Sequence, residues 1–563
     1  MSSTALLESA ISVLRSNADR WIALSTDRKI AMLERARARL GENIQRWIAA
    51  AAERRQFAPD SEQAGGEHLT GPFALANGIN GYIQTLKALT RESPLPVRVT
   101  QGSDGVTRVR VVPHSLPSAI IAQGITGTVW LEPGVAASSA RMGKPAYDGS
   151  SPGRVALVLG AGNIDSIPPL DVLHKLIDDG QVVLLKTNPV NEFIAPIMED
   201  IFREFVDEGF LHVATGGADV GAWLTRHASI DTIHVTGSER TYNAIAFGDG
   251  SDADERRRQN DPLLGKPITA ELGGVNPVVV VPGSWSSADI RYQARHIVSS
   301  KVVNVGFNCV ASQILIVPDD WSGTPQLLDE MRATLDGLEP RHVWYPGGEE
   351  RRDEAVRGRD NVETFLGKTR LSLIDGLSPD ETGDPLFHHE VFAPVLGIVR
   401  VKSADIETYT RRAVAFCNEV LRGTLGATVL MHPKTIKEHP QLYRMMLTEL
   451  RYGIIGMNVW NAAGYPLTEC TWGAFPGHDP SDIQSGVGHV HNTWMIRDAQ
   501  KTVLEGTFTP FARSVGAGAP TIWPSYPWFV RSGKVNAIGR AAAGYATDPR
   551  IGTLGRVVRV VLG

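Results

Sequence analysis

Short runs of consecutive apolar residues alternate with longer amphipathic segments from about residue 153 onward. Residues 155–159 and 182–186 show the first pattern, which is typical of strands buried on both faces of a sheet. Residues 191–208 show the second, with apolar side chains every three or four positions, and are predicted to form one amphipathic helix. The alternation predicts a parallel sheet with helices on both faces, and such sheets bind ligands at the carboxyl ends of their strands.

The same alternation resumes at Ile268 and predicts a second α/β pass, with a helix at about 287–302 and a strand at 395–401. Upstream of both passes, residues 26–55 are predicted to form a packing helix, because their apolar residues recur at helical spacing.

Four stretches lack such a pattern or show it only briefly. Residues 56–72 are polar and rich in glycine and are predicted to form a loop. Residues 249–262 carry many charges without apolar periodicity, which indicates a solvated surface loop. The run Ser118 to Ala122 is β-like, and residues 502–563, rich in Gly, Pro, Trp and Tyr, have no assigned role.

Composition narrows the class of protein. A chain of 563 residues with 42% hydrophobic and 21% charged residues should fold into at least two domains. The net charge of −5 argues against nucleic acid or an anionic membrane as the main partner. We see no signal peptide and no apolar run long enough to span a bilayer. Three scattered cysteines are too few for a disulfide framework, so a cytoplasmic location is expected.

Cys309 lies in the segment NVGFNCVAS, residues 304–312, and is the candidate nucleophile. We expect it at the start of a short helix after Gly306, where free backbone N–H groups favour the thiolate. The alternative is a buried structural cysteine, which is how we interpret Cys417 and Cys470.

Two further motifs occur in a fixed order around this thiol: Glu271 in ITAELGGVNP and Glu390, with Phe392, in HHEVFAPVLG. The ordered set resembles the aldehyde dehydrogenase superfamily, from about Arg28 to about Lys501. The resemblance implies an α/β fold with two parallel-sheet domains, one for the cofactor and one for catalysis, plus a small oligomerisation segment. It divides the chain into 1–267 (cofactor-binding, with 96–150 partly for oligomerisation), 268–457 (catalytic), 458–501 (return to the cofactor domain) and 502–563 (a C-terminal extension).

The resemblance also implies roles for three residues. Cys309 attacks the aldehyde, Asn163 donates to the oxyanion together with the Cys309 backbone N–H, and Glu271 is the general base that activates water. The alternatives without a catalytic role are that Asn163 is a turn asparagine and that Glu271 is a surface carboxylate at the end of a strand. Superfamily members that transfer the acyl group to coenzyme A generally lack this Glu, so Glu271 favours release of a free acid.

NAD or NADP is the cofactor that the resemblance implies. The chain departs from the family pattern at two positions. Pro189 replaces a frequent ribose-binding carboxylate, which leaves the choice between NAD and NADP open. Tyr242, where a glycine is usual, is expected to crowd the crevice. The residues that match the family's cofactor site are Lys186, Gly217, Gly221, Thr236, Gly237, Ser238, Glu390 and Phe392.

Two other patterns suggest sites that we do not expect. Gly160 and Gly162 begin a dinucleotide fingerprint, but Asp165 stands where its last glycine would be. The histidine pairs 388–389 and 489/491 have no partners at ligand spacing, so no metal site is predicted.

The expected function is NAD(P)-dependent oxidation of an aldehyde to a carboxylic acid through a thiohemiacetal and a thioester on Cys309. The alternatives are a coenzyme A-acylating dehydrogenase or acyl-CoA reductase, and a non-catalytic binding or scaffold protein with the same fold. The expected partners are a small aldehyde and further copies of the chain, as a homodimer or homotetramer. Phe307 and Asn308 should line the substrate site, and Trp460, Trp472 and the aromatic tail hint at an apolar or aromatic aldehyde, although aromatic residues also fill cores.

Overall fold

The structure is a computed structural model that describes residues 3–122, 124–365, 371–516, 521, 523 and 525–562. One of its sheets has six strands in the order β17-β8-β7-β4-β5-β6, all parallel except the edge strand β17. The run of apolar residues that predicts its central strands is buried on both faces. Its members are β4 (Val155–Leu159), β5 (Val182–Lys186), β6 (Leu211–Ala214), β7 (Thr232–Gly237), β8 (Ile268–Leu272) and β17 (Gly486–Val487).

The second sheet has eleven strands and is parallel in its centre, with antiparallel strands at both ends. The predicted α/β class is therefore confirmed, as a pair of mixed sheets. In spatial order the strands are β1 (Arg98–Gln101), β2 (Thr107–Val112), β3 (Thr126–Leu131), β19 (Ala499–Glu505), β15 (Ile454–Met457), β14 (Gly426–Leu430), β9 (Asn276–Val280), β10 (Ser312–Pro318), β13 (Val395–Val401), β12 (Leu371–Leu377) and β11 (Val362–Phe365).

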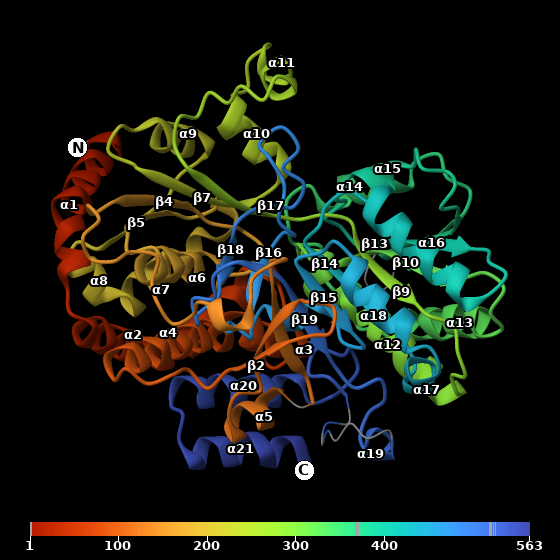
Figure 1. Cartoon of the computed structure of the whole chain (residues 1–563). Helices are drawn as coiled ribbons and strands as arrows, with labels where there is room; N and C mark the ends of the chain where they lie inside the picture. The colour runs from red at the N-terminus through yellow and green to blue at the C-terminus, as the bar shows by residue number, and fades with distance from the viewer. Residues whose placement is uncertain are drawn as a thin grey trace.

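Helices pack against the sheets and fill the connections between strands (Figure 1). The predicted helices over 26–55 and 287–302 are confirmed as α2 and α12. Helices that precede β9 in the sequence include α1 (Ser3–Ala23), α2 (Thr26–Arg55), α4 (Ala74–Thr90), α6 (Ile167–Leu173), η3 (His174–Asp178), α9 (Ala218–Arg226) and α10 (Glu239–Phe247). Helices that follow β9 include α12 (Ser287–Val302), η5 (Val303–Gly306), α13 (Gly323–Asp336), α14 (Gly348–Val356), α15 (Pro385–His388), α16 (Ile406–Glu419), α17 (Pro433–Glu438), α18 (Pro440–Glu449) and η6 (Asn461–Gly464).

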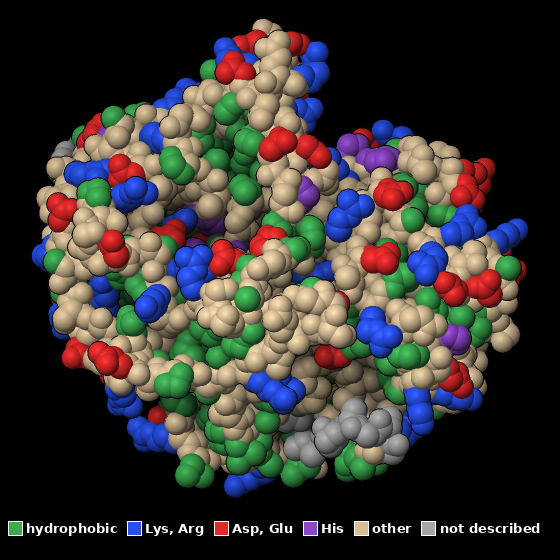
Figure 2. Space-filling model, viewed as in Figure 1, with side chains coloured by type: hydrophobic (Ala, Val, Ile, Leu, Met, Phe, Trp, Pro, Cys, Tyr) green, Lys and Arg blue, Asp and Glu red, His purple; other side chains and the backbone are tan. Residues whose placement is uncertain are grey.

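The amphipathic segment 191–208 is not one helix, so that prediction is wrong. It is divided into η4 (Pro189–Ile194), α7 (Ala195–Ile201) and α8 (Arg203–Asp207). Pro196 explains the first break, because it has no N–H to donate to the preceding turn. The predicted loop 249–262 is also wrong in part, since it contains the short exposed helix α11 (Ala253–Arg258), whose charged side chains project from the top of the molecule (Figures 1 and 2).

The second α/β pass does not begin at Ile268 as predicted, because residues 268–272 form β8 of the first sheet. β8 pairs with β7, and the chain crosses to the second sheet only after Leu272. The domain boundaries at 267, 457 and 501 stay predictions. The small pair β16 (Thr471–Gly473) and β18 (His489–His491) lies outside both sheets.

Residues 56–72 are mostly helical, contrary to the predicted loop: α3 (Glu62–His68) continues into the π-helical turn η1 (Leu69–Phe73). The reason is tertiary, because α3 packs against α20 (Val535–Thr547) of the C-terminal extension. The contact is so close that a Cβ atom at Gly65 would lie 2.4 Å from the backbone of Val535.

The C-terminal extension forms α19 (Arg513–Gly516), α20 and α21 (Ile551–Leu562). α20 and α21 lie at the lower edge of the molecule beside α5 (Leu116–Ala122), which replaces the predicted β-like run there (Figure 1). Apolar side chains gather at this edge of the surface, including Leu116 and Ile551 (Figure 2). Within the described residues, no helix combines the length and apolar character needed to cross a membrane.

Candidate active site

Cys309 follows an unusual reversal of the chain. Asn304, Val305 and Gly306, at the end of η5, all have left-handed backbone angles, with φ of 51°, 57° and 81°. This conformation is rare for a β-branched residue such as Val305 and is often found at functional sites. The reversal ends α12 and places Cys309 in a turn before β10. The prediction that Cys309 starts a helix is therefore wrong, and no helix N-terminus favours its thiolate.

The thiol of Cys309 is half-buried, whereas Cys417 and Cys470 are fully buried. Burial raises the pKa of the Cys309 thiol well above its usual range, and the nearby carboxylates of Glu271 and Glu390 raise it further. The thiol lies near enough to the Glu271 carboxyl for each group to affect the pKa of the other. At neutral pH the sulfur is thus protonated and lies near a carboxyl group that can take the proton once it is ionised.

Glu271 lies in β8 and is buried. Its Oε1 accepts a hydrogen bond of 3.2 Å from Nε1 of Trp472. Burial raises the pKa of Glu271 to about 8, and the neighbouring carboxylate of Asp171 adds to the increase. Asp171 is itself fixed by the hydroxyl of Thr236, which donates to it over 2.9 Å. The carboxyl of Glu271 therefore gains its charge only in mildly alkaline solution.

Asn163 reaches the same segment from the turn after β4. Its side-chain Nδ2 donates to the carbonyl of Phe307 over 3.1 Å, and Nδ2 of Asn304 donates to the Asn163 carbonyl over 3.0 Å. The amide of Asn163 is thereby anchored two residues ahead of Cys309, and it has a second N–H to offer.

Glu390 approaches from the other sheet. A Cβ atom at Gly273 would lie 2.0 Å from Glu390 Oε1, so a side chain there would displace the Glu390 carboxyl. Burial raises the pKa of Glu390 to about 8, with a contribution from Glu271. Among the described residues, this buried Oε1 has no hydrogen-bond partner. Phe392, two residues after Glu390, packs against Phe307, with the two ring centroids 5.8 Å apart.

A crevice lies at the carboxyl ends of β4, β5 and β7, and α10 separates it from a second crevice that reaches Glu390. The structure brings most of the predicted cofactor residues to these two crevices, with the exception of Phe392 among the described lining residues. The first contains Lys186, Gly217, Gly221, Thr236 and Gly237, and the second contains Ser238, Gly273, Gly274, Glu390 and Arg422.

These residues fit an extended dinucleotide. Gly221 leaves open space at the crevice, and Lys186 supplies a cation at that end. The unpartnered Oε1 of Glu390 supplies an acceptor at the other end, as ribose hydroxyls require. Ser238 caps α10 by accepting from the Thr241 N–H over 3.2 Å, and the remaining N–H groups of this helix end suit a phosphate.

Of the two departures from the family pattern, Tyr242 differs from expectation. Tyr242 does not crowd the crevice, because it is 1% exposed and packs in a core cluster with Val235 and Leu272. Pro189 is exposed at the start of η4. Two residues near Lys186 were not predicted from the sequence, Glu192 and Asp219. Burial lowers the pKa of Lys186, and the charges of these two carboxylates partly offset that decrease. Asp219 lies in the first turn of α9, and an acid at the start of a helix was the available signal.

One histidine of β18, His491, belongs to an aromatic cluster. His491 is buried and stacks on Trp472, with ring centroids 6.0 Å apart, and its ring is 4.8 Å from Tyr465. His388 and His389 line the rim of the second crevice. No cluster of three or more His, Cys, Asp or Glu side chains suited to a metal ion occurs in the part of the chain that the structure describes.

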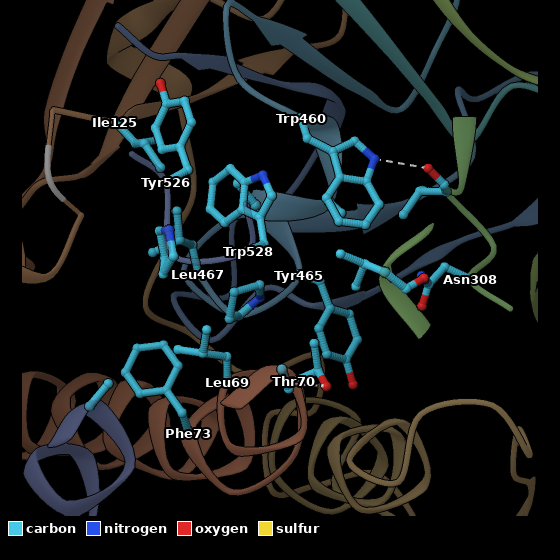
Figure 3. Close-up of a pocket in the computed structure, with 18 of the residues that line it drawn as sticks. Leu69, Thr70, Phe73, Ile125, Asn308, Trp460, Tyr465, Leu467, Tyr526 and Trp528 are labelled. Carbon is cyan, nitrogen blue, oxygen red and sulfur yellow. Dashed lines mark hydrogen bonds between the residues drawn. The ribbon is translucent and has the colours of Figure 1, made fainter. Parts of the chain in front are cut away.

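An apolar cavity opens on the other side of Cys309 (Figure 3). Leu69 and Phe73 of η1 face Tyr526, Trp528 and Trp460 across it (Figure 3). Trp460 is fixed by a hydrogen bond of 3.0 Å from its Nε1 to the Val310 carbonyl, next to the nucleophile. The thiol thus lies at the end of a hydrophobic chamber and beside a carboxyl group.

Comparisons with known proteins find relatives in one family. The sequence profile of the aldehyde dehydrogenase family matches residues 173–341. N-succinylglutamate 5-semialdehyde dehydrogenase of Sphingopyxis alaskensis is 27% identical over 54% of this chain and 60% of its own length. The chain thus matches less than two thirds of this relative.

Solved structures show the same fold. An aldehyde dehydrogenase of Mycobacterium tuberculosis complexed with NAD+ superposes with a TM-score of 0.57 and 17% identity, over 89% of this chain and 90% of that one. An NADP-dependent glyceraldehyde-3-phosphate dehydrogenase of Bacillus halodurans, complexed with NADP, also gives a TM-score of 0.57 and 17% identity, over 88% and 89% of the two chains.

Proposed function

We propose that the chain, whose residues 173–341 match the aldehyde dehydrogenase family, is a member of that superfamily and oxidises an aldehyde to a carboxylic acid with NAD or NADP. The observation that carries the proposal is the position of the half-buried Cys309 thiol, which lines an apolar cavity and lies near the buried carboxyl of Glu271. A structural cysteine needs neither an acid–base partner nor a cavity beside it.

The arrangement supports a sequence of steps in which Cys309 is the nucleophile. The Glu271 carboxylate takes the thiol proton, and the sulfur then bonds to the aldehyde carbon. The second N–H of the Asn163 side chain and the backbone N–H of Cys309 are the donors proposed for the resulting oxyanion.

The chemistry that a nicotinamide cofactor supplies is the acceptance of a hydride from the aldehyde carbon. After the hydride has left, the acyl group remains on sulfur as a thioester. Glu271, once it has released the first proton to solvent, takes a proton from the water that hydrolyses this thioester. Neither the coenzyme A alternative nor the non-catalytic alternative gains support from a specific contact.

The residues around Lys186 bear on the choice of cofactor. Two carboxylates, Glu192 and Asp219, lie close enough to act on its charge. They would repel a 2′-phosphate more than a free hydroxyl. We therefore expect a higher kcat/KM with NAD than with NADP, and an equal or reversed preference would contradict this assignment.

Replacement of the nucleophile tests the proposal. Cys309→Ala should remove aldehyde-dependent growth of absorbance at 340 nm, because no thioester can form, while calorimetry still detects dinucleotide binding. Cys417→Ala is the matched control, since Cys417 is buried in α16 away from the site, and it should retain turnover. Turnover by Cys309→Ala at the wild-type rate would exclude the assignment.

Location in the cytoplasm and assembly into a homodimer or homotetramer stay predictions. The exposed edge strand β1, in the segment 96–150, supports assembly, because its outer backbone groups can pair with another strand. Light scattering on the purified protein decides the oligomeric state.

A further inference from the structure

We propose that the substrate is an apolar aldehyde with a long alkyl or arylalkyl chain, held in a cavity whose outer wall is built by residues 525–562 of the C-terminal extension. This inference rests on the proposed function, because it names the substrate class for Cys309. It also gives a role to a segment that lies outside residues 173–341, where the family profile matches.

The cavity begins at Cys309 and Asn308 and ends under α5, α20 and α21. Its near part is formed by the catalytic segment and by η1, and its far part by Ile538, Ala542 and Val557 of the two C-terminal helices. None of the described residues that line it carries a charge. Among the polar lining residues, Asn308 directly precedes the nucleophile in the chain, where an aldehyde oxygen would be placed.

This lining selects against charged substrates. A carboxylate or ammonium group in the chamber would lose its hydration without gaining an ionic partner from the described lining residues, which is costly. Each methylene of an alkyl chain would instead gain from leaving water.

A smaller neighbouring cavity does contain arginines, and they are already engaged. Arg55 is paired with Glu67 and, at 2.6 Å, with Asp165, and all three side chains are at most 4% exposed. Arg341 donates to the Val302 carbonyl over 3.0 Å. The chamber at Cys309 is therefore the better place for the organic part of the substrate, and a carboxylate-bearing aldehyde is the appropriate counter-test.

The extension is built into the protein around the chamber. The Tyr526 and Trp528 rings are stacked, with centroids 4.7 Å apart and an angle of 5° between the planes. The Tyr526 hydroxyl accepts from the Thr507 N–H over 2.8 Å and donates to the Asn458 carbonyl over 3.2 Å. Both aromatic walls are thus positioned by the second sheet's strand ends.

The same segment is tied to α12, which leads directly into the Cys309 reversal. Arg295 of α12 donates to the Val530 carbonyl over 2.9 Å, and the Val530 N–H donates to the Ser299 hydroxyl over 3.1 Å. The chamber wall and the nucleophile are therefore held by one helix, which fixes the distance between thiol and wall.

A chain-length series tests the substrate class. With propanal, hexanal, decanal and 3-phenylpropanal, kcat/KM should rise about fourfold per added methylene until the chamber is filled. Succinic semialdehyde should be at least tenfold poorer than hexanal. A semialdehyde turned over as well as hexanal, or no dependence on chain length, would overturn the inference.

A variant pair tests the role of the extension. Ala542→Phe places a ring in the far end of the chamber and should lower kcat/KM for decanal at least tenfold more than for propanal. Ala537→Phe is the matched control, because Ala537 is exposed on the same helix and does not line the chamber. Ala537→Phe should leave the ratio of kcat/KM for decanal to kcat/KM for propanal unchanged. If both variants change this ratio equally, α20 has no part in substrate binding.

The outcomes separate this inference from the proposed function. No reduced cofactor with any aldehyde, from a protein that still binds NAD or NADP, would contradict the proposed function itself. Turnover that favours short or charged aldehydes would leave the oxidation established and refute the apolar chamber.

Discussion

Glu271 makes ionisation of Cys309 more difficult, because its carboxylate raises the pKa of the thiol. Two acidic groups that lie close together in a buried place cannot both lose a proton cheaply. The charge of Asp171 raises the pKa of Glu271 further, so that ionisation occurs at about pH 8. The motifs around Cys309 and Glu271 were sufficient to find both residues. The direction of their pKa shifts could not be predicted, because burial and the approach of Asp171 depend on the assembled fold.

The rate should therefore rise with pH. Glu271 acts as a base only when ionised, and its pKa is raised, so kcat/KM should increase through an apparent pKa of about 8 and level off above it. Asp171→Asn removes a negative neighbour and should move this limb to lower pH, whereas Glu271→Gln should lower kcat by about 10²-fold or more. Glu390 has a similar pKa, so the rise of kcat/KM with pH reports the titration of both carboxyl groups together. A pH–rate profile that Asp171→Asn leaves unmoved would contradict the electrostatic role.

At the scale of elements, the pattern of apolar residues predicted those strands and helices that are stabilised by neighbouring elements of the chain. β4, β5 and α12 have the predicted bounds because their apolar residues are buried by immediate neighbours in an alternating α/β array. α3 and η1 could not be predicted, because the helix is stabilised by α20, which the chain supplies hundreds of residues later. The glycines of α3 suggest a loop when read alone and allow close helix packing when α20 is present.

Two adjacent glycines in α3 test this explanation. Gly65→Ala should destabilise the protein by about 1–3 kcal/mol, because its Cβ would lie 2.4 Å from the backbone of Val535 and α20 would have to move. Gly66→Ala should be neutral or stabilising by about 0.5–1 kcal/mol, since a Cβ there has no atom within 4 Å. Urea unfolding measures both. Equal effects of the two substitutions would contradict close packing as the cause.

At the scale of the whole molecule, one arginine connects the two sheets across the second crevice. Arg422, just after α16, donates to Glu239 of α10 over 2.8 Å and to Asp482 over 2.6 Å. The parallel sheets themselves could be predicted from the alternation of elements. The pairing of Arg422 with Glu239 could not, because the two residues are 183 positions apart and neither belongs to a motif.

Loss of this connection should weaken cofactor binding. Arg422→Ala frees the first turn of α10, so the dissociation constant for NAD should rise several-fold in calorimetry, with at most about 1 kcal/mol of lost stability per ion pair. Arg411→Ala is the control, because Arg411 pairs with Glu407 within α16. An unchanged dissociation constant for Arg422→Ala would show that α10 is held by its core contacts alone.

The packing of α20 on α3 has a consequence for synthesis on the ribosome. The backbone N–H groups of Arg531 and Gly533 donate to Glu62 from 469 and 471 residues away, and Asn536 reaches Pro59 over 477 residues. Contacts of such long range form late in folding. A nascent chain in which Cys309, Glu271 and the residues of both crevices have been synthesised therefore still lacks the chamber wall. Its apolar surfaces around η1 must avoid contact with other chains until α20 has been translated.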